Sequence, residues 1–386
     1  MVTLLSRWFI KDRENTKSPA VRQAYGVLCG GLGIALNLLL FGIKFISGLI
    51  SSSIAITADA FNNLSDAASS VITLIGFKIA GQKPDQDHPF GHGRFEYISG
   101  FLVSVIILLM GLELLKSSFT KILHPEEPAF SPVILALLVV SILIKGYMYL
   151  YNKSLGKKLD SAVMKATATD SLSDMLATGA VLFSALLSRF TSLHADGWCG
   201  MLVGLFICYA GFSAAKDTVT PLLGQAPDPD FVQQVKSIVT SHEEILGLHD
   251  LIVHNYGPGR ILISLHAEVS AAGNIVTLHD VIDHIEHELR DTLNCQAVIH
   301  MDPIRVGDEE TEGGKKLIQD ILKEIDPALT MHDFHMAART ERTDLIFDVV
   351  TPYDFQLSDE TLAALIDQKV KALHPDYHII IDIDKP

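Results

Sequence analysis

The stretch that decides the fold is ADAFNNLSD, residues 58–66, because it places acidic and amide side chains inside an otherwise apolar run. The surrounding residues 53–80 exceed the ~20 residues that a helix needs to cross a bilayer core. A second run, 162–188, contains TDSLSD at residues 169–174. Carboxylates inside a bilayer are costly, so their presence in such runs favours a functional role.

Outward from these two runs, the composition is that of a membrane protein. Mean hydropathy is +0.31, and only 19% of the residues are charged. Lysine and arginine gather in the N-terminal arm and in the second and fourth connections, whereas the 51–53 connection has none. By the positive-inside rule, both termini of this predicted multi-pass protein of the cell membrane are cytosolic. Six spans are predicted: 26–50, 53–80, 96–119, 131–152, 162–188 and 198–215.

An acidic, soluble region follows Pro221. Residues 1–225 hold 18 basic and 15 acidic residues, whereas residues 226–386 hold 12 and 30, together with 12 of the 16 histidines. This charge disfavours nucleic acid as a partner and suits cation binding. The four cysteines are scattered and form no CxxC pair, so neither a disulfide framework nor a thiolate zinc site is predicted.

The soluble region reads as two similar α+β units. The first is predicted to be ferredoxin-like, with this pattern: helix 231–241, strands 249–256 and 261–269, helix 276–293, strand 297–301. Leu248-His249-Asp250 is echoed by Met331-His332-Asp333, and later segments recur at a similar offset, which predicts a duplication. Polar Glu309–Gly314 is predicted to be a linker. The predicted domains are an N-terminal arm 1–22, a membrane domain 23–220, and α+β domains 221–306 and 315–386.

The intramembrane polar residues form two pairs, Asn62 with Asp66 and Asp170 with Asp174. Each pair is four residues apart and therefore lies on one face of its helix. If the two faces meet, three carboxylates repel one another unless a cation or protons join them. The pattern predicts a site that exchanges a divalent metal ion for protons. The alternative, hydrogen bonding between helices, is preferred for Asp59. Three further charged residues are interpreted as snorkelling or pairing side chains: Lys44, Glu113 and Lys145.

Over about residues 20–305 the chain resembles the cation diffusion facilitators. The resemblance rests on ADAFNNLSD, on KPDQDHPFGHGRFE at residues 83–96, and on DSLSD at residues 170–174. It implies a homodimer, joined through its membrane and cytosolic domains, that exports divalent metal ions in exchange for protons by alternating access. It also implies that no organic cofactor takes part. The implied transport site consists of Asn62, Asp66, Asp170 and Asp174.

The composition of that site bears on the transported metal. Zinc-transporting members commonly place a histidine in one or both pairs, and this sequence has none there. Three carboxylates and one amide oxygen form a hard, all-oxygen set that suits Mn²⁺, and the set also resembles the manganese-exporting branch. Zn²⁺, Fe²⁺, Co²⁺ and Cd²⁺ stay open as alternatives, because raw affinity follows the Irving–Williams order.

The resemblance implies two secondary metal positions. One is in the 83–96 loop, where the alternative is a simple turn with solvated histidines; its residues are Asp85, His88 and His92. The other, at the dimer interface of relatives, lies on three predicted strands, and His279 on the neighbouring helix could join it. Its residues are His249, His266, His300 and Asp302.

The tail carries residues at the positions that correspond to the strand site. His332 corresponds to His249, and Asp348 and Asp382 correspond to His266 and His300. A hard-ligand site is one interpretation. A packing or regulatory extension without metal is the preferred one.

Other classes of function fit less well. A channel needs a continuous polar pore, whereas the carboxylates form one compact cluster. A membrane-anchored metal sensor leaves the intramembrane aspartates unexplained. An enzyme is not expected, because the sequence has no nucleophile–base arrangement and no GxxxxGK[ST] run. Uphill transport would then draw on an ion gradient.

Overall fold

A computed structural model describes residues 2–16, 18–50, 54–124, 132–190, 196–305, 307–338 and 342–385. Its contacts divide the chain into two units. The membrane unit is Met1–Ala226 with His254–Leu262, and the C-terminal unit is Pro227–Val253 with Ile263–Pro386. The 51–53 connection, on which the topology prediction draws, lies outside the described residues, and so does the side chain of Asp59.

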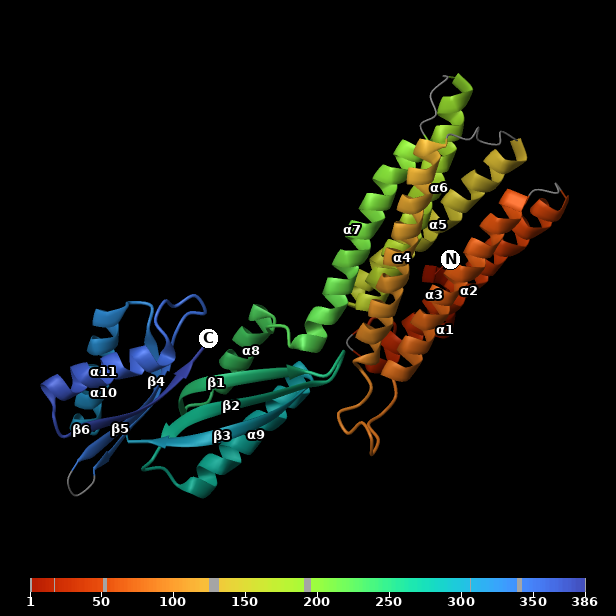
Figure 1. The fold of residues 1–386 in the computed structure, drawn as a ribbon. Coiled ribbons are helices and arrows are strands. Elements are labelled where there is room, and N and C mark those ends of the chain that lie inside the picture. Colours follow the sequence, from red (N-terminus) through yellow and green to blue (C-terminus); the bar gives the residue numbers. More distant parts are fainter. Residues whose placement is uncertain are drawn as a thin grey trace. The chain divides into compact units, whose positions relative to one another are not determined.

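The described part of the membrane unit contains a short helix, α1 (Val2–Phe9), and six long ones (Figure 1). Four of the long helices, α2, α4, α5 and α7, are long and apolar enough to cross a membrane. The other two, α3 and α6, have similar lengths but carry the carboxylate motifs. The long helices are α2 (Pro19–Ile50), α3 (Ile54–Ala80), α4 (Phe95–Leu123), α5 (Pro132–Lys158), α6 (Ala162–Phe190) and α7 (Asp196–Leu223). The predicted membrane domain, 23–220, is thus slightly short at both ends.

The long helices pack in pairs, α2 against α3, α4 against α7 and α5 against α6. Glycines permit the close approach that membrane helices use for association. A Cβ on Gly30 would lie 3.0 Å from the Cα of Leu74, and one on Gly111 would lie 3.1 Å from the backbone nitrogen of Cys208. These contacts leave the polar faces of α3 and α6 inside the bundle.

The C-terminal unit holds two α+β modules of the same element order, α-β-β-α-β. Their sheets have the orders β1-β2-β3 and β4-β5-β6. The first module has the order of helices and strands predicted from the sequence, and this order lacks the first strand of a complete β-α-β-β-α-β ferredoxin-like fold. The first module is α8 (Pro229–Val239), β1 (Ile245–Asn255), β2 (Ile261–Ser270), α9 (Ile275–Leu293) and β3 (Cys295–Ile304). The second is α10 (Glu309–Ile325), β4 (Thr330–Ala338), β5 (Thr343–Val350), α11 (Asp359–Leu373) and β6 (Tyr377–Asp384).

Alternation along the middle strands separates a core face from a polar face. Successive side chains of a strand point to opposite faces of the sheet. In β2, the residues on either side of His266 are buried, and in β5 the residues on either side of Asp348 are buried. His266 and Asp348 therefore lie on the face opposite the core in their respective sheets. The buried residues are Ile263, Leu265, Ala267 and Val269 in β2, and Leu345, Phe347 and Val349 in β5.

The prediction of a linker at Glu309–Gly314 is wrong, because these residues begin helix α10. Three glutamates lie in its first turn, where the positive end of the helix dipole stabilises negative side chains. Gly314 is buried, and a Cβ there would lie 2.6 Å from Met336 Sδ and 3.1 Å from Phe334 Cζ. This glycine serves close packing rather than a turn, so the second module begins at 309 and not at 315.

The two modules also share an unusual backbone conformation. Asp250 has a φ of 51° and Asp333 a φ of 50°, a left-handed region that aspartate tolerates better than most residues do. Each follows the histidine of the echoed motif. The register of β4 shifts between His332 and His335, as expected where one strand residue is bulged.

Candidate metal centres

The two carboxylate-bearing helices are joined by a hydrogen bond between buried threonines. The hydroxyl groups of Thr73 on α3 and Thr167 on α6 lie 2.8 Å apart. Asp66 precedes Thr73 by seven residues and Asp174 follows Thr167 by seven, about two helical turns in each case. If the two helices run in opposite directions, these equal spacings bring Asp66 level with Asp174, and Asp170 then lies about one turn nearer to the threonine bridge.

A lysine from α5 joins these carboxylates. Lys145 Nζ donates to Asp66 Oδ2 at 2.8 Å and to Asp174 Oδ2 at 2.5 Å. Its side chain is only 4% exposed. Asp170 is buried as well, and its Oδ1 has no hydrogen-bond partner among the described residues. Lys145, interpreted from the sequence as a snorkelling or pairing side chain, is therefore a pairing one. Its partners are two of the predicted transport residues, Asp66 and Asp174.

The remaining charged or polar residues of the spans are placed differently. Asn62 is exposed, one turn before buried Asp66 on α3. Lys44 is buried in α2 and Glu113 is exposed on α4. Asp66, Asp170 and Asp174 are not among the described groups whose potential metal-ligand atoms all lie within 4.8 Å of one another. The Lys145 ammonium group instead bonds to two of these three carboxylates.

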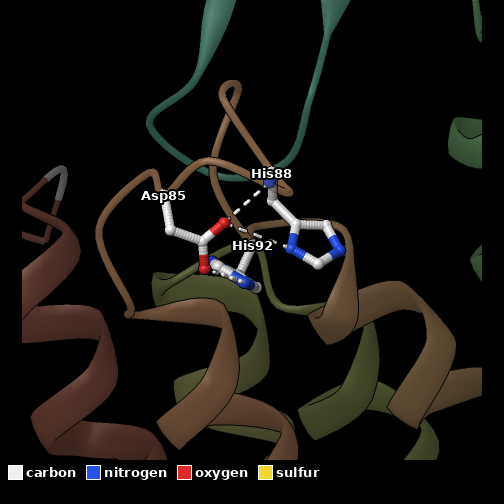
Figure 2. A group of neighbouring side chains, drawn as sticks. All are labelled: Asp85, His88 and His92. Atoms are coloured by element: carbon white, nitrogen blue, oxygen red, sulfur yellow. Dashed lines mark hydrogen bonds and ion pairs between the residues drawn. The ribbon is translucent and has the colours of Figure 1, made fainter.

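The three predicted loop residues lie together between α3 and α4. Figure 2 shows the Asp85 carboxylate beside the two imidazole rings, within reach of a nitrogen of each. Asp85 Oδ1 lies 3.4 Å from His88 Nδ1, and Oδ2 lies 3.4 Å from His92 Nε2. The backbone N–H of His88 donates to Asp85 at 2.7 Å, and this bond holds the pKa of the exposed Asp85 carboxyl below its ordinary value. His92 is buried, and its Nδ1 has no hydrogen-bond partner in the described part of the chain.

Residues of the His254–Leu262 segment, which belongs to the same unit, hold this loop. The Phe90 and Tyr256 rings stack with centroids 4.5 Å apart. Arg94 donates to the carbonyl oxygen of Asn255 at 3.1 Å and lies over the Tyr256 ring. Contacts of the aromatic and basic residues of the loop therefore hold it in place, with His92 buried and His88 exposed.

Four predicted residues of the first α+β module meet on the polar face of its sheet. Asp302 Oδ2 lies 2.8 Å from His266 Nδ1 and 3.3 Å from His249 Nε2. Its Oδ1 lies 3.1 Å from His300 Nε2. The fifth residue, His279, lies elsewhere: it lines a cavity with Ile299 and Met301. These two residues alternate with His300 and Asp302, so the cavity is on the opposite face of the sheet.

In the second module, the structure assembles a related group with one change from the prediction. His332 Nδ1 lies 3.8 Å from Asp348 Oδ2, and His332 Nε2 lies 3.8 Å from Asp384 Oδ2. Burial raises the pKa of Asp348, and the nearby Asp384, Asp333 and Asp250 carboxylates add to the rise, partly offset by His332. Asp382, which was predicted to belong to this group, pairs with Asp348 in register but is not in the group. Asp384 takes its place, and the offset between Asp302 and Asp384 in the repeat is the signal in the sequence that indicates it.

Comparison with known proteins identifies the family. Residues 32–223 match the family described as cation efflux transmembrane domain, and residues 227–304 match the cation efflux protein, cytoplasmic domain. An uncharacterized transporter of Methanocaldococcus jannaschii is 32% identical over 272 residues, which cover 70% of this chain and 96% of that protein. The chain belongs to the cation diffusion facilitator family. This confirms the resemblance found in the sequence.

Other similar family members carry more specific names. The manganese efflux system protein MneS of Bacillus subtilis is 29% identical over 71% of this chain and 94% of its own length. The cation-efflux pump FieF of Serratia proteamaculans is 27% identical over 72% of this chain and 93% of its own. Membership makes this cation diffusion facilitator a multi-pass membrane protein of divalent cation efflux, a transporter and not an enzyme. The matched cytoplasmic domain is a dimerising one. The second α+β module lies beyond both matched ranges.

Proposed function

We propose that this cation diffusion facilitator exports Mn²⁺ from the cytosol in exchange for protons, by alternating access. The transport site would consist of Asn62, Asp66, Asp170 and Asp174. The observation that carries the proposal is the convergence of buried Asp66 and half-buried Asp174, from two different helices, on one cationic group inside an apolar bundle. A position that holds an ammonium group between carboxylates also suits a metal ion.

All six long helices would cross the membrane. Helices α3 and α6 have 27 and 29 residues, more than the ~20 that a bilayer core requires. Their lower hydropathy comes from residues that face the bundle, such as Asp66, Ser69 and Ser70 on α3. Charged groups are tolerated in a membrane where they face a bundle interior and pair there. An even number of crossings agrees with two cytosolic termini.

The charges of the site favour an electroneutral exchange. Three aspartates and the ammonium groups of Lys145 and of buried Lys44, which also acts on Asp66, together carry −1. One Mn²⁺ ion and two protons each add two positive charges, so the charge of the site is the same whichever it holds. Because burial penalises additional net charge, we infer that two protons return for each metal ion that leaves. Lys145 would then swing away from Asp66 and Asp174 when the metal enters, and would return when it departs.

Two observations support Mn²⁺ as the substrate. The proposed ligands are all oxygen atoms, a set that suits Mn²⁺ better than the nitrogen- and sulfur-seeking Zn²⁺. Two similar proteins of Bacillus subtilis, MneS and MneP, are named manganese efflux system proteins. Efflux of Zn²⁺, Fe²⁺, Co²⁺ or Cd²⁺ by the same mechanism is the alternative, supported by the similarity to proteins named only as cation-efflux pumps.

The secondary centres would act outside the transport step. The loop residues Asp85, His88 and His92 bring three ligand atoms together, so we propose that they bind a divalent metal ion. The same holds for the His249–His266–Asp302 group of the first module. There, metal binding would draw two acidic cytosolic domains of a homodimer together by neutralising charge that otherwise repels. His279 lies on the other sheet face of its own chain, so we leave it out of this site.

Transport by inside-out vesicles tests the proposal. Mn²⁺ uptake with an imposed pH difference is expected to be lost in Asp66→Asn and Asp174→Asn, because each removes a charged ligand with little change of shape. Asp160→Asn is the matched control, since Asp160 is exposed and pairs only with Lys165 among the described residues. Full uptake in both site variants would exclude the proposed site.

The same vesicles test the counter-ion and the selectivity. An electroneutral exchange predicts uptake that responds to the pH difference but not to an imposed membrane potential. Asn62→His should shift the preference from Mn²⁺ towards Zn²⁺, because an imidazole nitrogen replaces an amide oxygen. An unchanged metal profile would show that these four residues do not set selectivity.

A further inference from the structure

The two α+β modules of the C-terminal unit meet at their histidine-bearing faces. The His249 ring of the first module stacks on the His332 ring of the second, with centroids 5.0 Å apart and planes at 27°. Asp250 Oδ1 lies 3.4 Å from His332 Nε2. Ligand atoms of His249, Asp250 and His332 thus lie within 4.8 Å of one another, although they come from strands of different sheets.

His332 lies among carboxylates from both modules. On its own module it approaches Asp348 and Asp384, each at 3.8 Å, and on the other module it approaches Asp250. Lys385, the residue after Asp384, contacts Thr351 at 2.6 Å and Asp359 at 3.8 Å instead. Three carboxylate groups from the two modules therefore surround one imidazole group.

The distances from His332 to the two carboxylates of its own module leave room for a metal ion. Hydrogen bonds between nitrogen and oxygen are about 2.7–3.2 Å long, shorter than the 3.8 Å from His332 to Asp348 and to Asp384. Ligand atoms about 2.1 Å from a tetrahedral Zn²⁺ ion lie roughly 3.4 Å from one another. His332 Nδ1 is buried and has no hydrogen-bond partner among the described residues, and the His249 side chain beside it is only 6% exposed.

We propose that His332, Asp348 and Asp384 of the second module, whose ligand atoms lie within 4.8 Å of one another, bind one divalent first-row transition-metal ion. Nitrogen and carboxylate ligands in combination suit Zn²⁺, Fe²⁺ and Mn²⁺ better than Mg²⁺ or Ca²⁺. His332 binds the ion through Nδ1, beside Asp348, so its Nε2–H faces Asp250 of the first module. The ion fixes the His332 ring, and this ring holds the second module against the first. The second module thereby becomes a cytosolic element whose attachment depends on metal. All three ligands lie beyond the residues that match the known cation efflux domains.

Counting bound metal on the full-length protein in detergent tests this site. Metal-free protein is titrated with Zn²⁺ alone, and bound zinc per chain is measured for the unchanged protein and for His332→Asn and Asp384→Asn. The control is His335→Asn, on the same strand, because His335 bonds to Asp333 at 2.6 Å and lies outside the group. Asp384 is 45% exposed, so its substitution tests the site even where His332→Asn disturbs folding.

We expect both site variants to bind one zinc ion fewer than the unchanged protein, or to bind it at least about 100-fold more weakly. Loss of a residue that only hydrogen-bonds to a metal ligand already lowers the affinity for the metal about 10- to 100-fold. Zinc should also slow hydrogen exchange of the β4 amides in the unchanged protein and in His335→Asn, but not in the site variants. Equal zinc counts in all four proteins would overturn the proposal. So would β4 protection that does not depend on zinc, since an ion pair of charged His332 would then suffice. None of these residues lies in the membrane unit, so the outcome is independent of the transport proposal.

Discussion

Replacing Lys145 by methionine separates two roles that its contacts allow. In the first role, the ammonium group competes with the transported ion for Asp66 and Asp174. In the second, it is a permanent support of the bundle. Methionine keeps most of the apolar stem and removes the charge, so the two roles predict opposite changes in metal affinity.

The size of the effect follows from the two hydrogen bonds. Lys145 donates to Asp66 at 2.8 Å and to Asp174 at 2.5 Å. A hydrogen bond to a charged group contributes about 1.5–3 kcal/mol, so an entering metal ion gives up roughly 3–6 kcal/mol when it displaces the ammonium group. At about 1.4 kcal/mol per factor of ten, Lys145→Met should tighten Mn²⁺ binding by about 10²- to 10⁴-fold.

Tighter binding should slow transport. A transport site must hold its ion weakly enough to release it, and affinity differences of this kind appear mainly in the dissociation rate. We therefore expect Lys145→Met to bind Mn²⁺ more tightly in detergent, by calorimetry, and to take it up more slowly in vesicles. Lys153→Met is the control, because Lys153 lies on the same helix, is exposed, and contacts only Tyr149 among the described residues.

Thermal unfolding distinguishes the two roles independently of transport. Without metal, Lys145→Met should be less stable, because removal of one partner from a buried pair costs about 3–5 kcal/mol. Saturating Mn²⁺ should then raise its melting temperature more than that of the unchanged protein, since a 100-fold tighter ligand adds about 2.7 kcal/mol. Weaker Mn²⁺ binding, with no such recovery, would refute the competitor role and leave Lys145 as a support.

Two further predictions concern the helix that replaced a predicted linker and the loop centre. Gly314→Ala should be less stable than Gly313→Ala by about 1–2 kcal/mol in chemical unfolding, because a Cβ at 314 meets Met336 and Phe334 whereas one at 313 meets nothing within 4 Å; equal stability would mean that α10 does not pack on β4. The hydrogen bond from the His88 N–H lowers the pKa of Asp85 in the folded protein. This bond therefore stabilises the loop fully above the pKa that Asp85 has in the unfolded chain. The stabilisation is lost as pH falls through the lower pKa that Asp85 has in the folded protein. Exchange of the His88 amide should accelerate over that acid range, whereas in Asp85→Asn it should show no such step.

Structural features that depend only on the spacing of residues along the chain could be predicted from the sequence. The spacing of Asp66, Asp170 and Asp174 placed them on helix faces, and the alternation around His266 identified a strand with one polar face. These features are local, since a helix repeats every 3.6 residues and a strand every two. For the same reason, the six long helices and the element order of the first module were predicted, although some helix ends differ from the structure by as much as eight residues.

What the sequence did not show depends on contacts between distant segments. Lys145 lies 79 residues from Asp66, and no local period indicates which helix supplies the opposing charge. Glu309–Gly314 was predicted to be a linker because polar segments that contain glycine usually are linkers. The close approach of Met336 and Phe334 on β4 explains why a glycine stands at 314 inside a helix. Asp250 and His332 come from different modules, so a repeat in the sequence predicted two separate clusters where the structure joins them.

The three kinds of proposed metal centre differ in ligand chemistry, so different metal ions would fill them. The proposed transport site is all oxygen, whereas the loop and C-terminal centres combine imidazole with carboxylate. By the Irving–Williams order, the nitrogen-bearing centres bind Zn²⁺ more tightly than Mn²⁺, and an all-oxygen site discriminates less. A cytosol with surplus Zn²⁺ would therefore fill the centres outside the membrane first and attach the second module to the first, while the transport site still met Mn²⁺. If attachment of the second module alters transport, one metal would regulate the export of another; Mn²⁺ uptake by vesicles of unchanged and His332→Asn protein, with and without Zn²⁺ on the cytosolic face, measures that coupling directly.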